Sequence, residues 1–259
     1  MARSIWNGAI VFGSVVVPVK LYSAIEDRTV HFRELHAKDG APIEHRRVSS
    51  KTGREVPSER IVKGYETSRG RWVLLTDEEI KAIEAPARKA IEIEDFVPAD
   101  QVDPAFYDRP YHLGVGDDGR EPYAVLHAAL KKAGRVGIGR VVLRGREQLV
   151  AVRAGADNLL EMSTMRYADE LIDPGDVDVS APSRTPTKQE VDMAAKLTQG
   201  LHQRFKSGDY EDEYRARVLD YLGRKAEGED VELPEDEAPE ETGDDLAAAL
   251  EASVKAVRG

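Results

Sequence analysis

The chain has 259 residues, 41% of them hydrophobic and 33% charged, so it is long enough to bury a hydrophobic core. It contains no cysteine, which excludes disulfides, thiolate metal sites and cysteine nucleophiles. Its apolar runs stay well short of the roughly 18 residues that a membrane helix needs, and its first residues lack the apolar stretch of a signal peptide. We therefore expect a cytoplasmic protein with no membrane partner.

The net charge of −11 is unevenly distributed along the chain. Residues 226–259 carry 12 acidic and two basic residues, whereas the rest of the chain carries 36 acidic and 35 basic residues and is almost neutral. Within this body, residues 28–71 hold 11 basic and 6 acidic residues, and residues 131–153 hold seven basic residues and one acidic residue. The acidic total therefore does not exclude a basic binding face.

The two basic segments are candidate contacts for a polyanion. Taken singly, the first is also typical of a solvated loop face, and Lys131 and Lys132 in the second are also typical of a helix C-terminus. Neither segment alternates its charges with the aromatic side chains on which unpaired bases stack. Together they favour binding to the phosphate backbone of a duplex over binding to single strands or RNA.

The first 75 residues predict a strand pair followed by a long polar insertion. Residues 5–12 and 15–22 are apolar and β-branched and flank a Gly-Ser turn, and Pro18 suggests an edge or a bulge. Residues 26–71 are polar and basic, with isolated apolar residues, so they cannot form a core and are expected to be a linker or an arm. Strand character returns at residues 71–75.

The middle of the chain predicts alternating helices and strands. The Thr-Asp-Glu-Glu sequence at residues 76–79 is a capping box that opens a short helix, and residues 90–97 alternate apolar and acidic side chains as a half-buried strand does. A hairpin with arginines at its tip is expected from residues 136–143 and 148–153, and a further strand from residues 158–165. A helix beginning at Pro122 should precede the hairpin, with an apolar face made of Val125, Leu126, Ala129, Leu130 and Ala133.

Beyond residue 175 the chain is expected to be helical and then disordered. A second capping box at residues 187–190 opens a helix, and the acidic residues 226–243 are expected to be disordered. Two apolar stripes at helical spacing precede the acidic residues: Val191, Ala194, Leu201 and Phe205, then Tyr210, Tyr214, Val218 and Leu222. A last amphipathic helix is expected to present Leu246, Leu250, Val254 and Val257. It could dock on its own domain, although its long charged tether favours folding into a partner's groove.

Catalytic and metal-binding motifs are missing from the sequence. GxxxxGK[ST], HExxH and GxSxG do not occur, a hydrolase would lack a candidate nucleophile–base pair, and the six histidines show no close ligand spacing. Residues 114–119 match GxGxxG, but two aspartates would repel a pyrophosphate and no apolar-periodic helix opens directly behind them, so we interpret them as a turn. We expect no enzyme, no catalytic residues, no metal, no cofactor and no small-molecule substrate.

Several short segments, taken in order, resemble the bacterial Ku family of DNA end-joining proteins. They are Ile-Trp-Asn-Gly-Ala-Ile at residues 5–10, Val-Pro-Val-Lys-Leu-Tyr-Ser-Ala at 17–24, Leu-Thr-Asp-Glu-Glu-Ile at 75–80, Ile-Glu-Asp-Phe-Val-Pro at 93–98 and Tyr-Glu-Asp-Glu-Tyr-Arg at 210–215. Each motif is short, but their order extends over about residues 1–225. The resemblance departs where relatives can carry a CxxC motif, because this chain has Ser-Ser-Lys-Thr there.

The resemblance implies an α+β fold that is mainly β. A Ku-core β-barrel would be formed by residues 1–26 and 72–175, and residues 27–71 would be an arm inserted in the barrel that encircles DNA. Residues 176–225 would form a helical C-terminal arm, followed by an acidic disordered tail, residues 226–259, with a terminal amphipathic helix.

The resemblance also implies a function. The protein would be a non-catalytic homodimer whose ring threads onto double-stranded DNA ends, protects and bridges them near the nucleoid, and recruits and stimulates the ATP-dependent DNA ligase D. Ligase recruitment would use Leu246, Leu250, Val254 and Val257. The alternative is an interaction adaptor whose basic arm binds an acidic protein. Cations expected to contact DNA are Lys20, Arg46, Arg47, Lys51, Arg54, Lys63, Arg135 and Arg140.

Overall fold

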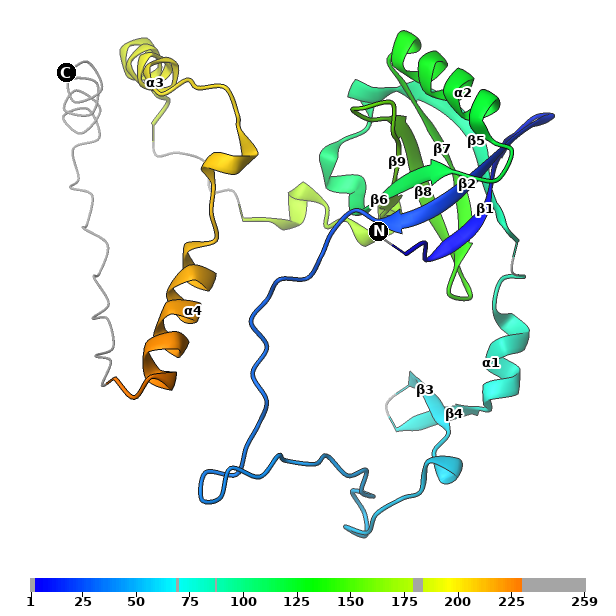
Figure 1. Ribbon diagram of the computed structural model, residues 1–259, viewed down its shortest axis with the longest axis vertical. Coiled ribbons are helices and arrows are strands. Elements are labelled where there is room, and N and C mark those ends of the chain that lie inside the picture. Colours follow the sequence, from blue (N-terminus) through cyan, green and yellow to red (C-terminus); the bar gives the residue numbers. More distant parts are fainter. Residues whose placement is uncertain (1–2, 69, 87, 179–183, 230–259) are drawn as a thin grey trace. The chain divides into compact units, whose positions relative to one another are not determined.

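The computed structural model describes residues 3–68, 70–86, 88–178 and 184–229 (Figure 1). It divides into two compact units, one made of Met1–Arg28 with Arg33–Asp176 and the other of Thr29–Phe32 with Val177–Gly259. The domain boundaries implied by the resemblance stay predictions, because this division follows contacts between segments and does not test them.

The first unit contains a closed barrel of seven strands (Figure 1). The strand order is β1-β2-β6-β9-β8-β7-β5, and β1 closes on β5 as a parallel pair whereas the other neighbours are antiparallel. The strands are β1 (Trp6–Phe12), β2 (Val15–Ser23), β5 (Ala90–Pro98), β6 (Tyr107–Val115), β7 (Arg135–Leu143), β8 (Arg146–Ala154) and β9 (Leu160–Met165). The expected barrel, and six of its strands to within two residues, are confirmed.

The barrel core follows from the alternation of side chains along each strand. Successive residues of a strand point to opposite faces, so every second residue points inward. Ile10 of β1, Val17 and Leu21 of β2, and Val150 and Val152 of β8 are almost completely buried. Pro18 fits in β2 because its partner Ala9 in β1 donates its amide to Lys89 instead, and pairing with β6 begins at Val19. The missing amide hydrogen therefore breaks no ladder bond.

Helix α2 (Arg120–Ala133) covers one end of the barrel. Its Tyr123 hydroxyl donates to the Leu113 carbonyl oxygen of β6 at 2.5 Å and accepts from the Leu160 amide of β9 at 2.7 Å, and burial raises the pKa of Tyr123. The helix therefore holds the ends of two neighbouring strands as well as filling the core.

Two predictions about α2 were wrong. The buried stripe is Tyr123, Leu126, His127 and Leu130, whereas Val125 is 69% exposed and Ala129 and Ala133 are also exposed. Apolar residues alone were counted in the sequence, but the Tyr123 hydroxyl is hydrogen-bonded and a His127 ring nitrogen lies 3.3 Å from the Gly155 carbonyl oxygen. Partnered in this way, both polar side chains can be buried.

The second wrong prediction was that no helix opens directly behind the GxGxxG match. Helix α2 begins there, with Gly119 as its N-cap. The glycines serve packing: a Cβ on Gly116 would lie 2.6 Å from the Pro18 carbonyl carbon, and one on Gly119 would lie 2.6 Å from the Pro18 oxygen. The interpretation of these residues as a turn stands, since Gly116 donates to that same oxygen at 2.9 Å.

The chain between β2 and β5 carries few regular elements. They are β3 (Lys63–Ser68), β4 (Arg71–Leu75) and α1 (Asp77–Ile83), and β3 pairs with β4 as a separate two-stranded sheet. The capping box at Thr76 is confirmed, with both of its hydrogen bonds present. Short 3₁₀ turns occur here and elsewhere at Ser58–Arg60, Ala99–Gln101, Pro104–Phe106, Ala168–Glu170, Pro174–Asp176 and Ser207–Asp209.

The second unit contains α3 (Lys188–Gly200) and α4 (Glu213–Ala226). The capping box at Thr187 is confirmed. The two predicted stripes were wrong as continuous helical faces, because α3 ends at Gly200 and α4 begins at Glu213; Phe205 and Tyr210 lie between the helices and stack on each other with ring centroids 5.5 Å apart. No residue of either helix is buried. The predicted terminal helix falls outside the described residues.

Candidate nucleic-acid interface

The eight cations predicted to contact DNA come from two parts of the first unit. Arg46, Arg47, Lys51, Arg54 and Lys63 follow β2 in the long insertion, whereas Lys20, Arg135 and Arg140 lie on barrel strands. Their surroundings differ, and the difference separates cations that are available to a phosphate from those already engaged by the protein.

Residues 47–56 form a tight antiparallel turn, which we call the arm turn. Its ends are joined by the Val56 amide donating to the Arg47 carbonyl oxygen at 2.8 Å and the Ser49 amide donating to the Arg54 carbonyl oxygen at 2.9 Å. Gly53 closes it with φ of +66°, a conformation that other residues adopt with strain. The sequence therefore builds a short, internally bonded loop in a segment otherwise poor in regular structure.

The arm turn carries three exposed cations without carboxylate partners among the described residues: Arg47, Lys51 and Arg54. The three lie within ten consecutive residues, and when such cations neutralise phosphates, the counterions condensed on the nucleic acid are released, which favours binding through entropy. The arm turn is the strongest candidate for a contact with a nucleic-acid backbone.

Two other cations of the insertion form only weak, solvent-exposed ion pairs. Arg46 lies 3.4 Å from Glu55 and 3.9 Å from Glu44, and Lys63 lies 3.5 Å from Asp77. Exposed pairs of this kind contribute about 0–1 kcal/mol, so a phosphate can replace the carboxylate at little cost.

The three barrel cations are engaged by the fold itself. Lys20 Nζ lies 2.7 Å from Asp117, and the hydrogen bond and charge of Asp117 raise the pKa of Lys20. Arg140 contacts Glu94 at 2.8 Å and Glu147 at 3.7 Å, and Arg135 donates to the carbonyl oxygen of Phe96 at 2.8 Å. These side chains join strands and turns that are distant in sequence.

Sequence reasoning missed the carboxylates that pair with two of the barrel cations, Lys20 and Arg140. Asp117 is 97 residues from Lys20, and Glu94 is 46 residues from Arg140. Only the register of the barrel brings these residues together, because β5 pairs with β7 and β2 with β6. Glu147 carried a local signal, since it follows the Arg144–Gly145 turn that folds β8 back on β7.

The described residues contain no group of three or more His, Cys, Asp or Glu side chains placed to hold a metal ion. Two histidines of the insertion each pair with one acid, His36 with Asp39 at 2.8 Å and His45 with Glu34 at 3.0 Å. In this same part of the chain, no helix is long and apolar enough to span a membrane.

The first unit contains a closed seven-stranded barrel with a long basic insertion between β2 and β5. This architecture corresponds to a known class of protein domain. The family model that matches the chain is described as the Ku70/Ku80 beta-barrel domain, and it covers residues 11–193. The match includes the arm turn and all seven barrel strands except the first residues of β1.

Curated bacterial proteins are similar over the whole chain. The non-homologous end joining protein Ku of Anaeromyxobacter sp. (strain K) is 43% identical over 258 residues, which cover 100% of this chain and 87% of that protein. The proteins of the same name from Bacillus subtilis (strain 168) and Symbiobacterium thermophilum are 35% and 37% identical, with 83% and 63% of their lengths covered. The chain belongs to the Ku family.

Proposed function

We propose that the protein binds the ends of double-stranded DNA without regard to sequence, as a non-catalytic component of non-homologous end joining. The observation that carries the proposal is the arm turn, with its exposed and unpartnered Arg47, Lys51 and Arg54. Contacts from such side chains to phosphate position a protein on a duplex but carry no sequence information. The names of the curated relatives support the same role.

We also propose that two copies of the chain join into a ring that threads onto a DNA end. A ring can be loaded only from a free end, so its binding depends on the topology of the DNA. The arms would supply the phosphate contacts, while Lys20 stays paired with Asp117, and Arg140 with Glu94 and Glu147. The protein would hold and protect the ends, and another enzyme would seal them.

The test is a gel-shift comparison of one DNA length as a linear duplex and as a closed circle, across a salt series. Tight binding to the linear form and weak binding to the circle supports threading. Equal binding to both would mean attachment from an open side, and the ring would be wrong. Binding to neither would favour an adaptor whose basic arm binds an acidic protein partner.

Recruitment of the ATP-dependent DNA ligase D is the second part of the proposal. It rests on the apolar spacing of Leu246, Leu250, Val254 and Val257, which lie outside the described residues. Replacing Leu246 and Leu250 by alanine should abolish stimulation of the ligase and leave DNA binding unchanged. Val231→Ala with Leu233→Ala is the matched control, because it removes apolar residues from the same acidic tail. Equal loss in both variants would contradict a specific docking helix.

A further inference from the structure

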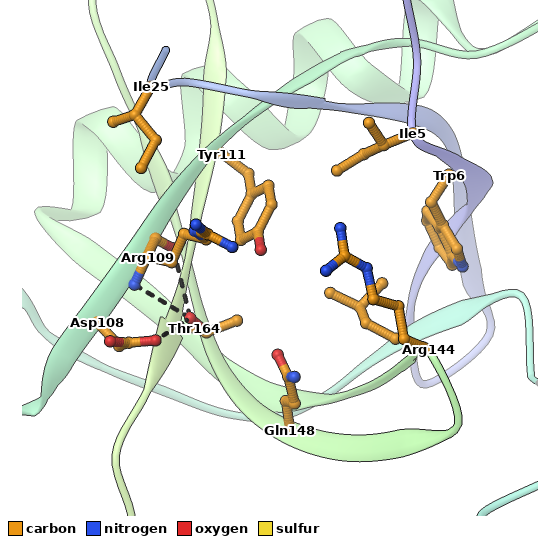
Figure 2. Close-up of a pocket in the computed structure, with 10 residues that line it drawn as sticks. Ile5, Trp6, Ile25, Asp108, Arg109, Tyr111, Arg144, Gln148 and Thr164 are labelled. Atoms are coloured by element: carbon orange, nitrogen blue, oxygen red, sulfur yellow. Dashed lines mark hydrogen bonds between the residues drawn. The ribbon is translucent and has the colours of Figure 1, made fainter. Parts of the chain in front are cut away.

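The end of the barrel opposite α2 contains a pocket of about 410 Å³ (Figure 2). Helix α2 holds Leu113 at the end of β6 and Leu160 at the start of β9. The pocket is lined instead by Arg109 at the start of β6 and Thr164 at the end of β9. It is therefore the open mouth of the barrel, and we call it the mouth pocket.

The inward-facing rows of the barrel become polar as they reach the mouth pocket. On β6 the row runs from buried Leu113 through Tyr111 to Arg109, and on β9 it ends at Thr164. On β8 it ends at Gln148, two residues before buried Val150. Apolar residues at these positions would extend the core, so the change to polar groups indicates a cavity that holds something polar. Mouths of β-barrels are common places for ligand sites.

Two guanidinium groups point into the mouth pocket from different walls, Arg109 from β6 and Arg144 from the turn between β7 and β8 (Figure 2). Neither has a carboxylate partner within the described part of the chain. The one acidic residue of the lining, Asp108, is already engaged: it contacts Arg166 at 3.1 Å and accepts from the Thr164 hydroxyl at 3.1 Å. The pocket therefore carries two uncompensated positive charges.

The backbone at Arg144 supports a role beyond closing the hairpin. Its φ is +53°, and the following Gly145 has φ of +78°. A two-residue turn with positive φ at both positions favours Asn or Asp ahead of Gly. A long cationic side chain at this position is strained, and strain of this kind is retained where surrounding structure or function requires it.

The rest of the lining can hold a planar, weakly polar body. Tyr111 and Trp6 are half-buried and lie at the pocket with Ile5 and Leu143. Trp6 has a fixed place because its ring lies over Gly8, where a Cβ would be 2.2 Å from the indole. Rings and aliphatic side chains thus surround the two guanidinium groups.

We infer that the mouth pocket binds a phosphate monoester attached to a planar body, such as a nucleoside monophosphate. A phosphate monoester carries about −1.5 to −2 charges near neutral pH, which balances two guanidinium groups, whereas one carboxylate would leave an excess positive charge. Guanidinium groups bind phosphate oxygens through paired N–H donors, and the flanking rings and aliphatic side chains would cover the base.

The experiment is calorimetric titration of the full-length protein with adenosine monophosphate, adenosine and inorganic phosphate. Adenosine monophosphate should bind saturably and more tightly than either of its parts. Arg109→Gln and Arg144→Gln should each weaken it by about tenfold or more, because each removes a charge-assisted contact. Arg146→Gln is the matched control: Arg146 lies two residues from Arg144, is exposed and does not line the pocket.

Three outcomes of these titrations would overturn the inference, and a fourth would come from the arm turn. They are the absence of saturable binding, an equal loss in Arg146→Gln, and inorganic phosphate binding as tightly as the nucleotide. Neutralising Arg47, Lys51 and Arg54 together separates this site from the arm turn: binding of the nucleotide should survive, and its loss would place the nucleotide on the arm turn. Arg144 lies in an exposed turn, and glutamine, like arginine, has a β-carbon, so Arg144→Gln should leave the fold unchanged. This variant therefore tests the inference even if Arg109→Gln fails to fold.

Discussion

Replacing the three unpaired cations of the arm turn should flatten the salt dependence of DNA binding. The variant is Arg47→Gln with Lys51→Gln and Arg54→Gln. Each phosphate contact contributes about 0.9 to the slope of log affinity against log salt, so three lost contacts lower the slope by about 2.7, or about 5.4 if both arms of a homodimer bind. Between about 50 and 200 mM salt, one contact changes the affinity about 3.5-fold.

The assay is a gel shift with a linear duplex at four salt concentrations, from which the slope is fitted for each protein. The matched control is Arg88→Gln with Arg217→Gln and Arg224→Gln, which removes the same total charge. Those arginines are paired with Glu92, Glu213 and Glu229. Because these arginines lie outside the arm turn, the control should change the slope by less than about one contact. Equal slopes for both variants would refute the assignment of the phosphate contacts to the arm turn.

Three predictions concern the stability of the scaffold. Tyr123→Phe leaves two backbone groups of β6 and β9 without a partner and should lower the free energy of unfolding by about 2 kcal/mol in urea titrations. Tyr111→Phe, whose hydroxyl has no hydrogen bond within the described chain, should change it little. Gly116→Ala places a Cβ 2.6 Å from a β2 carbonyl carbon and should cost about 1–3 kcal/mol, whereas Gly208→Ala meets nothing within 4 Å and should be tolerated. Hydrogen bonds from the Thr76 backbone and, to a smaller extent, from its side chain lower the pKa of Glu79 from the ordinary value of 4.5. The stability that Glu79 gives to α1 is therefore fully present above pH 4.5 and is lost as the pH falls through the lowered pKa. Amide exchange in α1 should therefore be faster in Glu79→Gln than in the unaltered protein at neutral pH, with the difference shrinking in acid.

The strands were predictable where their side chains alternate simply. Residues 5–12 and 15–22 have β-branched runs around a glycine turn, and both became barrel strands. β6 was missed because Asp108, Pro110 and His112 interrupt any apolar pattern. The strand forms regardless, since Pro110 lies at a register shift opposite β9 and its inward row still reaches buried Leu113. A strand whose outward row is polar and whose inward row ends in arginine gives little signal in sequence alone.

The candidate site was predictable only as a charge excess. Composition located the basic insertion, but it could not distinguish Arg46 from Arg47. Arg46 contacts Glu55, nine residues further along the chain, whereas Arg47 has no carboxylate partner among the described residues. It also favoured Arg140 on charge alone, although pairing of β5 with β7 places Glu94 against it. Local turns can be inferred from neighbours in sequence, whereas compensation across a barrel depends on register, which no short motif encodes.

Pairing of cations with carboxylates also explains how an acidic protein can bind anions at particular sites. Arg140, Arg153 and Arg166 on the barrel each face a carboxylate from another strand, so they add contacts between strands without adding net positive charge. Cations without such partners include Arg47, Lys51 and Arg54 of the arm turn and Arg109 and Arg144 of the mouth pocket. A duplex and a small phosphate ester would therefore be bound at separate places on the chain. Because the two sites share no residue, neutralising one should leave the affinity of the other unchanged to within about 0.5 kcal/mol, as expected for independent positions.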